Sequence, residues 1–102
     1  MNFNEYQQKA MAFRLASADS PYAFLGLIGE VGELYGAIAK AMRDDTEIDP
    51  MYIQKELGDI LWFIAAITTD MQLNLSDVAE KNIEKLGGRK ARGTIQGSGD
   101  DR

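Results

Sequence analysis

The sequence predicts an all-α fold of four to five helices. Apolar residues recur at spacings of three and four along most of the chain, which is the helical period. Both prolines, Pro21 and Pro50, stand directly before long apolar-periodic segments, where proline favours the first turn of a helix. No segment shows the alternation of apolar and polar residues that is typical of a strand.

Four helical segments follow from these signals. The first carries Tyr6, Ala10 and Phe13 at helical spacing, and Pro21 precedes the second. Pro50 opens the third, and Ser76 is a suitable N-cap for the last. The expected ranges are 4–16, 22–42, 50–71 and 76–86.

The chain divides into a helical domain, residues 1–88, and a C-terminal tail, residues 89–102. The tail is rich in glycine and in charges of both signs and has little to bury, so we expect it to be mobile in isolation. A single domain of 102 residues has a modest core. Because the third helix is apolar on nearly all sides, we expect homo-oligomerisation to complete the bundle.

The composition of the chain limits the metals and the partners that it can bind. The chain has no cysteine and no histidine, so a bound metal must be held by oxygen atoms, which favours Mg²⁺, Mn²⁺ or Ca²⁺. A net charge of −5 argues against nucleic acid and anionic membranes as partners. No uncharged apolar stretch reaches the length of about 18 residues that a membrane span needs. We therefore expect a soluble, cytoplasmic protein.

Two pairs of acidic residues are the candidate site. Glu30 and Glu33 lie on the second predicted helix, and Glu56 and Asp59 lie on the third. A spacing of three places each pair on one helix face, so two adjacent helices can direct four carboxylates at one point. A divalent cation is the natural ligand of such a group.

The surroundings of these pairs favour a site over a solvated surface. Glycines and alanines flank Glu30 and Glu33, which suggests that something packs closely there, and Glu56 lies among isoleucines and Phe63. An ionised carboxylate in apolar surroundings must be paired, bound to metal or protonated. The simpler interpretations are a solvated helix face for the first pair and a surface salt bridge between Lys55 and Asp59 for the second.

Three stretches together resemble the MazG-like nucleoside triphosphate pyrophosphohydrolases, an all-α superfamily. They are Gly26-Leu27-Ile28-Gly29-Glu30-Val31-Gly32-Glu33-Leu34, Lys55-Glu56-Leu57-Gly58-Asp59-Ile60-Leu61-Trp62, and Asn82-Ile83-Glu84-Lys85-Leu86 with Arg89. The similarity extends from Tyr6 to the final residues and covers nearly the whole chain. One departure is Thr68-Thr69-Asp70, where the family is usually more apolar.

The resemblance implies a MazG-like helical bundle, assembled as a homodimer or homotetramer and related to dimeric dUTPases. It implies cleavage of a nucleoside triphosphate between the α and β phosphates, giving monophosphate and pyrophosphate. Glu30, Glu33, Glu56 and Asp59 would hold Mg²⁺, with Mn²⁺ as an alternative, and would be the catalytic residues. One glutamate would act as general base toward water.

The substrate contacts that the resemblance implies lie elsewhere in the chain. Asn82 and Lys85 would contact the phosphates or the sugar, and Lys40 and Arg89 are further phosphate ligands on charge and position. Candidates for the base pocket are Gln7, Tyr6, Tyr35 and Trp62, and a core role suits Trp62 equally well. Two other functions stay open: a non-catalytic module that binds metal or nucleotide and acts through a partner protein, and a purely structural bundle.

Overall fold

The computed structural model describes all 102 residues and contains four helices and no strand. They are α1 (Phe3–Met11), α2 (Ser20–Asp44), α3 (Pro50–Asp70) and α4 (Leu75–Arg92). Side chains of the preceding residues cap the first three: Asn2, Asp19 and Asp49 each accept a hydrogen bond from a backbone N–H of the first turn. The prediction of an all-α fold is confirmed.

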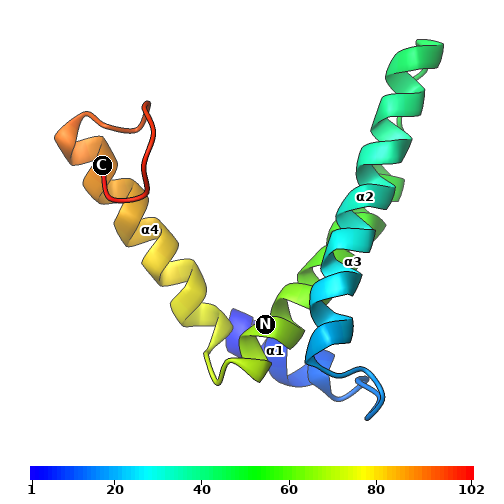
Figure 1. Cartoon of the computed structure of the whole chain (residues 1–102), viewed down its shortest axis with the longest axis horizontal. Coiled ribbons are helices and arrows are strands. Elements are labelled where there is room, and N and C mark those ends of the chain that lie inside the picture. Colours follow the sequence, from blue (N-terminus) through cyan, green and yellow to red (C-terminus); the bar gives the residue numbers. More distant parts are fainter.

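The helices form a V (Figure 1). Helices α2 and α3 lie side by side as one arm, α4 is the other arm, and α1 lies at the vertex, where it packs against both α3 and α4. The short link 45–49 makes α2 and α3 an antiparallel hairpin. The two arms diverge, so α4 lies apart from most of the α2–α3 hairpin.

Three predicted helix ends were wrong. Helix α1 ends at Met11, not at residue 16, and the last helix begins at Leu75 after Asn74, so Ser76 is inside the helix and is not its cap. Helix α4 also continues through Gly87 and Gly88 to Arg92. A glycine inside a helix costs only about 1 kcal/mol, so it does not by itself end one.

The actual stop signal of α4 is Gly93, which adopts the left-handed conformation at φ 72°. The chain then folds back on α4 through Gly97 and Gly99, which also have positive φ. Polar contacts, and not an apolar core, hold this segment together. The guanidinium of Arg102 donates to the carbonyl oxygens of Thr94, Ile95 and Gly99 at 2.7–2.9 Å.

The core of the single chain is small. One cluster joins Ala10, Ala65 and Leu75, and a second joins Ala23, Phe63 and Ala66. Trp62 lies between them, its indole N–H donates to the carbonyl oxygen of Ala10 at 3.0 Å, and its ring meets Phe63 edge-on. Trp62 therefore packs as a core residue.

A partly buried ion pair links the α1–α2 connection to the end of α3. The guanidinium of Arg14 binds the carboxylate of Asp70 through two hydrogen bonds of 2.8 and 2.9 Å, and the Ser20 hydroxyl donates to the same carboxylate. Arg14 also donates to the carbonyl oxygen of Ala18. The polar Thr68-Thr69-Asp70 stretch thus has a structural use, since Asp70 anchors the connection.

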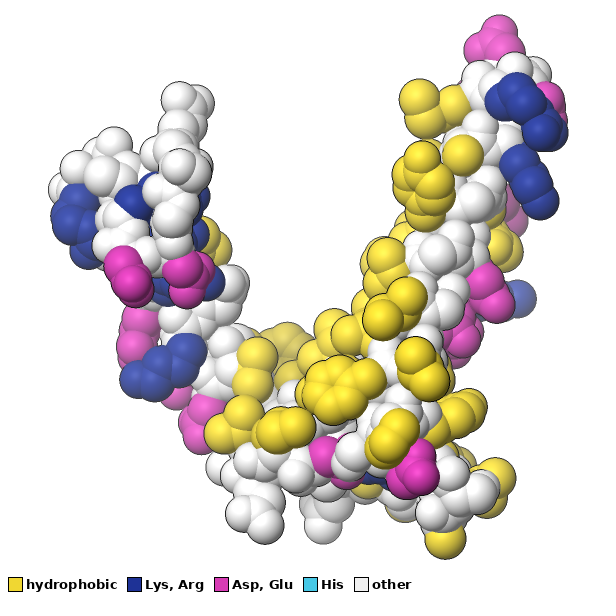
Figure 2. All heavy atoms as spheres, viewed as in Figure 1, with side chains coloured by type: hydrophobic (Ala, Val, Ile, Leu, Met, Phe, Trp, Pro, Cys, Tyr) yellow, Lys and Arg dark blue, Asp and Glu magenta, His cyan; other side chains and the backbone are white.

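The chain exposes far more surface than a folded monomer of its mass. Its accessible surface is 7642 Å², whereas about 5,700 Å² is expected at 11.3 kDa, an excess of about 1,900 Å². Its radius of gyration is 16.5 Å, against about 13 Å for a compact chain of this length. Apolar side chains line the inner side of the V along the hairpin arm (Figure 2).

Helix α2 alone is long and apolar enough to cross a membrane by length and composition. Core helices of soluble proteins pass the same test. Glu30 and Glu33 lie near its middle, and a charged side chain at the centre of a bilayer costs roughly 2.5–3.5 kcal/mol by insertion measurements.

Candidate metal centre

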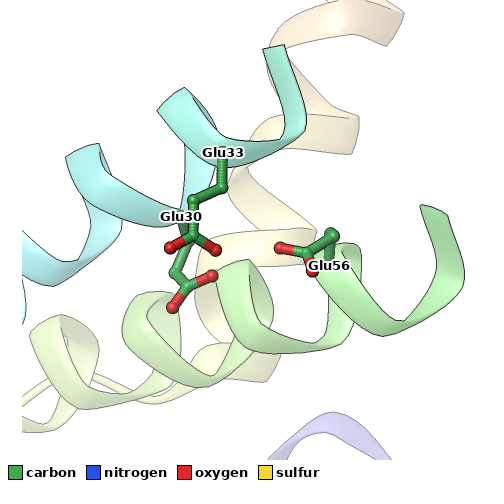
Figure 3. Close-up of side chains that lie close together, drawn as sticks. All are labelled: Glu30, Glu33 and Glu56. Atoms are coloured by element: carbon green, nitrogen blue, oxygen red, sulfur yellow. The ribbon is translucent and has the colours of Figure 1, made fainter. Parts of the chain in front are cut away.

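Three glutamates converge between α2 and α3 (Figure 3). Glu30 and Glu33 extend from successive turns of α2, and Glu56 extends from α3 toward them. One carboxylate oxygen of each lies within 4.8 Å of one of each of the others. The i to i+3 spacing on α2 thus produces the shared face that it predicted, and the antiparallel hairpin supplies the third carboxylate.

These carboxylates lack partners within the chain. The Oε2 atoms of Glu30 and Glu56 are buried and accept no hydrogen bond, and no ion pair involves any of the three glutamates. Burial raises the pKa of Glu30, and the charges of Glu33, Asp59 and Glu56 raise it further. Such a group needs either protons or a cation. Hard oxygen donors with unused lone pairs fit Mg²⁺ or Mn²⁺.

Asp59 stands at the edge of this group. It is exposed and is not one of the three converging residues, yet its charge acts on Glu30, and it adds to the effect of burial, which raises the pKa of Tyr6. Three of the four predicted carboxylates are therefore brought together, and Asp59 is their neighbour. Its role as a metal ligand stays a prediction.

Tyr52 is a neighbour of the site that sequence reasoning missed. Desolvation raises the pKa of its hydroxyl, and the charges of Glu56, Glu33 and Glu30 add to the effect. Tyr52 lies one turn before Glu56 on α3, so the i to i+4 spacing was the available signal.

A small residue on α2 allows the two helices to approach. A Cβ atom at Gly26 would overlap the ring of Phe63 on α3, and Ala23 is fully covered beside it. The expectation that something packs closely against the small residues of this helix is confirmed at Gly26.

The predicted substrate contacts on α4 lie on the other arm of the V. Asn82 and Lys85 line a groove along α4 together with Val78. The ammonium of Lys85 lies 3.3 Å from the carboxylate of Asp100. Arg89 is buried, and it donates to the backbone carbonyl of Asp100 at 2.7 Å.

The other predicted contacts are scattered. Lys40 is exposed near the far end of α2, ten positions beyond Glu30. The amide of Gln7 ties α1 to the α3–α4 turn: it donates to Thr69 and to the carbonyl oxygen of Leu73, and it accepts from the N–H of Leu75. Substrate contact by any of these residues stays a prediction.

Comparison with known protein families identifies the domain that contains the predicted site residues. Residues 22–93 match the MazG nucleotide pyrophosphohydrolase domain, a segment that contains all four predicted carboxylates together with Asn82, Lys85 and Arg89. The chain belongs to the MazG family.

A relative from a bacteriophage is similar to this chain over most of both sequences. The Gene 37 protein of Mycobacterium phage L5 is 41% identical over 85 residues, which is 79% of this chain and 75% of the phage protein. No solved structure matches the chain. The MazG resemblance inferred from the three stretches is thus confirmed.

Proposed function

We propose that this MazG domain is a Mg²⁺-dependent nucleoside triphosphate pyrophosphohydrolase. It would cleave a ribo- or deoxyribonucleoside triphosphate between the α and β phosphates and release the monophosphate and pyrophosphate. The observation that carries the proposal is the convergence of Glu30, Glu33 and Glu56, in which Glu30 and Glu56 each have a buried oxygen atom without a partner. Membership of the family supports it.

The carboxylates have two tasks in this proposal. Glu30, Glu33 and Glu56, with Asp59 beside them, would hold the metal, which neutralises phosphate charge and makes water a stronger nucleophile. Without that cation the acidic group would repel a triphosphate. One of the glutamates would accept the proton of the attacking water.

Basic and polar side chains would contact the phosphates or the sugar of the substrate. Lys85 would neutralise charge that develops on the departing pyrophosphate, and Asn82 would orient the sugar or the phosphates. Because both lie on the arm away from the glutamates, we propose that the active form is a homodimer or homotetramer in which the arms of different copies meet. Lys40 and Arg89 would be further phosphate ligands. We also propose that the protein acts in the cytoplasm.

A substrate panel tests the reaction. Purified protein is incubated with each common nucleoside and deoxynucleoside triphosphate and Mg²⁺, and the products are identified by anion-exchange chromatography. We expect monophosphate and pyrophosphate in equal amounts. Release of single phosphate, or no turnover of any nucleotide, would contradict the proposal.

Two substitutions test the carboxylates. Glu33→Gln and Glu56→Gln remove a metal-binding charge and keep side-chain size, so each should lower turnover by at least about 100-fold, as loss of a group that stabilises developing charge does. Helicity measured by circular dichroism should be unchanged. Glu47→Gln, in the exposed link between α2 and α3, is the matched control and should keep full activity.

A non-catalytic module is the second candidate. Within one chain the separation of the glutamates from Asn82 and Lys85 is what favours it. Calorimetric binding of Mg²⁺ and nucleotide without any product over the whole panel would support this function in place of hydrolysis.

A further inference from the structure

Residues 93–102, the strap, fold back along α4 and close on themselves (Figure 1). The guanidinium of Arg102 donates to three backbone carbonyl oxygens of the strap at 2.7–2.9 Å, so one side chain spans the segment. The backbone carbonyl of Arg102 accepts from Arg92 at 2.8 Å, which ties the strap to the helix. These contacts give the strap a defined place beside α4 that its composition does not reveal.

The strap places the carboxylate of Asp100 on two cations of α4. Its Oδ1 atom lies 3.3 Å from the Nζ atom of Lys85 and 3.3 Å from an Nη atom of Arg89. The same Arg89 nitrogen donates to the backbone carbonyl of Asp100 at 2.7 Å. Lys85, and to a smaller extent Arg89, lowers the pKa of Asp100 below its ordinary value. Asp100 is therefore an ionised carboxylate that both cations hold.

Arg89 has donors that this contact does not use. Its side chain keeps only 9% of its surface exposed, and its Nε atom is buried without a hydrogen-bond partner. Both of its contacts with Asp100 come from a single nitrogen, whereas a guanidinium can bind two oxygens of a phosphate in parallel. A buried donor without an acceptor is costly. An anion with more acceptor oxygens than a carboxylate would therefore satisfy Arg89 better.

The distribution of charge also favours anion binding in this part of the chain. The net charge is −5, yet residues 81–102 contain six of the eleven lysines and arginines and only three of the sixteen acidic residues. Two of those three, Asp100 and Asp101, belong to the strap, and only Asp100 contacts the cations of α4. The strap thus supplies the counter-charge to a locally basic region.

We propose that the strap is an autoinhibitory element in which Asp100 takes the place of a substrate phosphate on Lys85 and Arg89. The inference rests on the proposed function, which assigns phosphate contacts to these two cations. A polyphosphate carries more charge and more acceptor oxygens than a carboxylate, so it displaces Asp100. Asp100 keeps 82% of its side-chain surface exposed, and a solvent-exposed ion pair is weak enough to exchange readily. The apparent affinity for phosphate groups is lowered by the fraction of molecules in which Asp100 occupies the cations.

An NMR titration with inorganic pyrophosphate measures this competition. Metal is first removed from the full, isotope-labelled chain on a chelating resin, so that neither a bound metal nor hydrolysis affects the result. Pyrophosphate is added at about 0.15 M salt while the Nε–H resonance of Arg89 and the amide resonances of residues 93–102 are followed. Shifts of these resonances locate the bound pyrophosphate and give its Kd.

Asp100→Asn removes the competing charge and keeps side-chain size. We expect it to lower the Kd of pyrophosphate by about 2-fold to 5-fold, the range that a solvent-exposed ion pair allows. Asp101→Asn is the matched control, because it makes the same change of charge at the next position, where the side chain contacts neither cation. It should change the Kd by less than about 1.5-fold, since charges that are not in contact are largely screened.

Arg102→Lys tests the strap separately from the charge of Asp100. Lysine keeps the positive charge but lacks the planar group that reaches three carbonyl oxygens, so the strap is loosened. The Kd of pyrophosphate should fall by a similar factor as in Asp100→Asn. The two changes combined should give no further gain, because both act on one contact.

Three results would overturn the autoinhibitory strap. They are an unchanged or higher Kd in Asp100→Asn, an equal effect of Asp101→Asn, and no shift of the Arg89 resonance with pyrophosphate in any variant. Failure of the proposed function gives a different result, in which pyrophosphate binding responds to Asp100→Asn but no nucleotide is hydrolysed. Hydrolysis by a chain whose pyrophosphate Kd ignores Asp100 would leave the function intact and refute the strap alone.

Discussion

Arg14 and Asp70 show how single residues hold the vertex of the V. Their side chains keep only 14% and 17% of their surface exposed, and the two-pronged contact fixes the geometry of both. The guanidinium holds the pKa of Asp70 below its ordinary value of 3.8, and the hydroxyl of Ser20 lowers it further. A lowered pKa in the folded state means that the ionised carboxylate stabilises the fold.

Asp70→Asn should therefore remove the contribution of Asp70 to stability and the acid sensitivity that goes with it. At pH 7 the variant should lose about 2 kcal/mol in urea unfolding, because Arg14 is left partly buried without its counter-charge. The unmodified chain has this contribution above pH 4 and loses it as the pH falls below about 4, so the two curves should converge toward pH 2. Asp44→Asn removes only the exposed pair with Arg43 and should change little. Parallel curves from pH 7 to 2 would contradict this role of Asp70.

Helix α2 shows that glycines within one helix can have different structural roles. Gly26 is needed because Phe63 occupies the space of its side chain, whereas Gly32 and Gly36 have nothing near them within the chain. Composition marks all these glycines as costly for a helix, and only packing distinguishes them.

Gly26→Ala should destabilise the protein although alanine is the better helix former. The gain of about 1 kcal/mol in helix propensity is outweighed by overpacking against the buried ring of Phe63, which costs roughly 1–3 kcal/mol. Gly87→Ala on α4 has open space and should stabilise by about 1 kcal/mol. Opposite signs in thermal unfolding are the expected result, and stabilisation by both changes would show that Phe63 moves aside freely.

The whole molecule exposes the amount of surface that is typical of a chain that packs against a second chain. Only eight of its 102 residues are buried, and none of its large side chains is fully enclosed. Core burial is the main favourable term in folding, so an isolated V of this shape has little to offset its conformational entropy.

Thermal stability should therefore depend on protein concentration. If folding and assembly are coupled, raising the concentration from 1 to 100 μM favours the folded form by up to about 2.7 kcal/mol and should raise Tm by at least about 5 °C. Scanning calorimetry or circular dichroism over that range measures it, with two scan rates to confirm reversibility. A Tm that is constant over the range would show that the single chain is stable by itself.

The sequence by itself determined the parts that depend on neighbours along the chain. Pro21 and Pro50 indicated where α2 and α3 begin, and the spacing of Glu30 and Glu33 set their common face. The position of Glu56 on the next helix was sufficient to predict a joint carboxylate group. These features follow from helix geometry, which is local.

Only the tertiary structure decided which faces meet. It selected Glu30, Glu33 and Glu56 as the convergent carboxylates, placed Asp59 beside them, and put Asn82 and Lys85 on a separate arm. It also extended α4 past two glycines and assigned Asp70 to Arg14. Spacing along a helix fixes the direction of a side chain relative to its own axis, but its neighbours depend on how separate axes pack, and contacts between residues far apart in the chain set that packing.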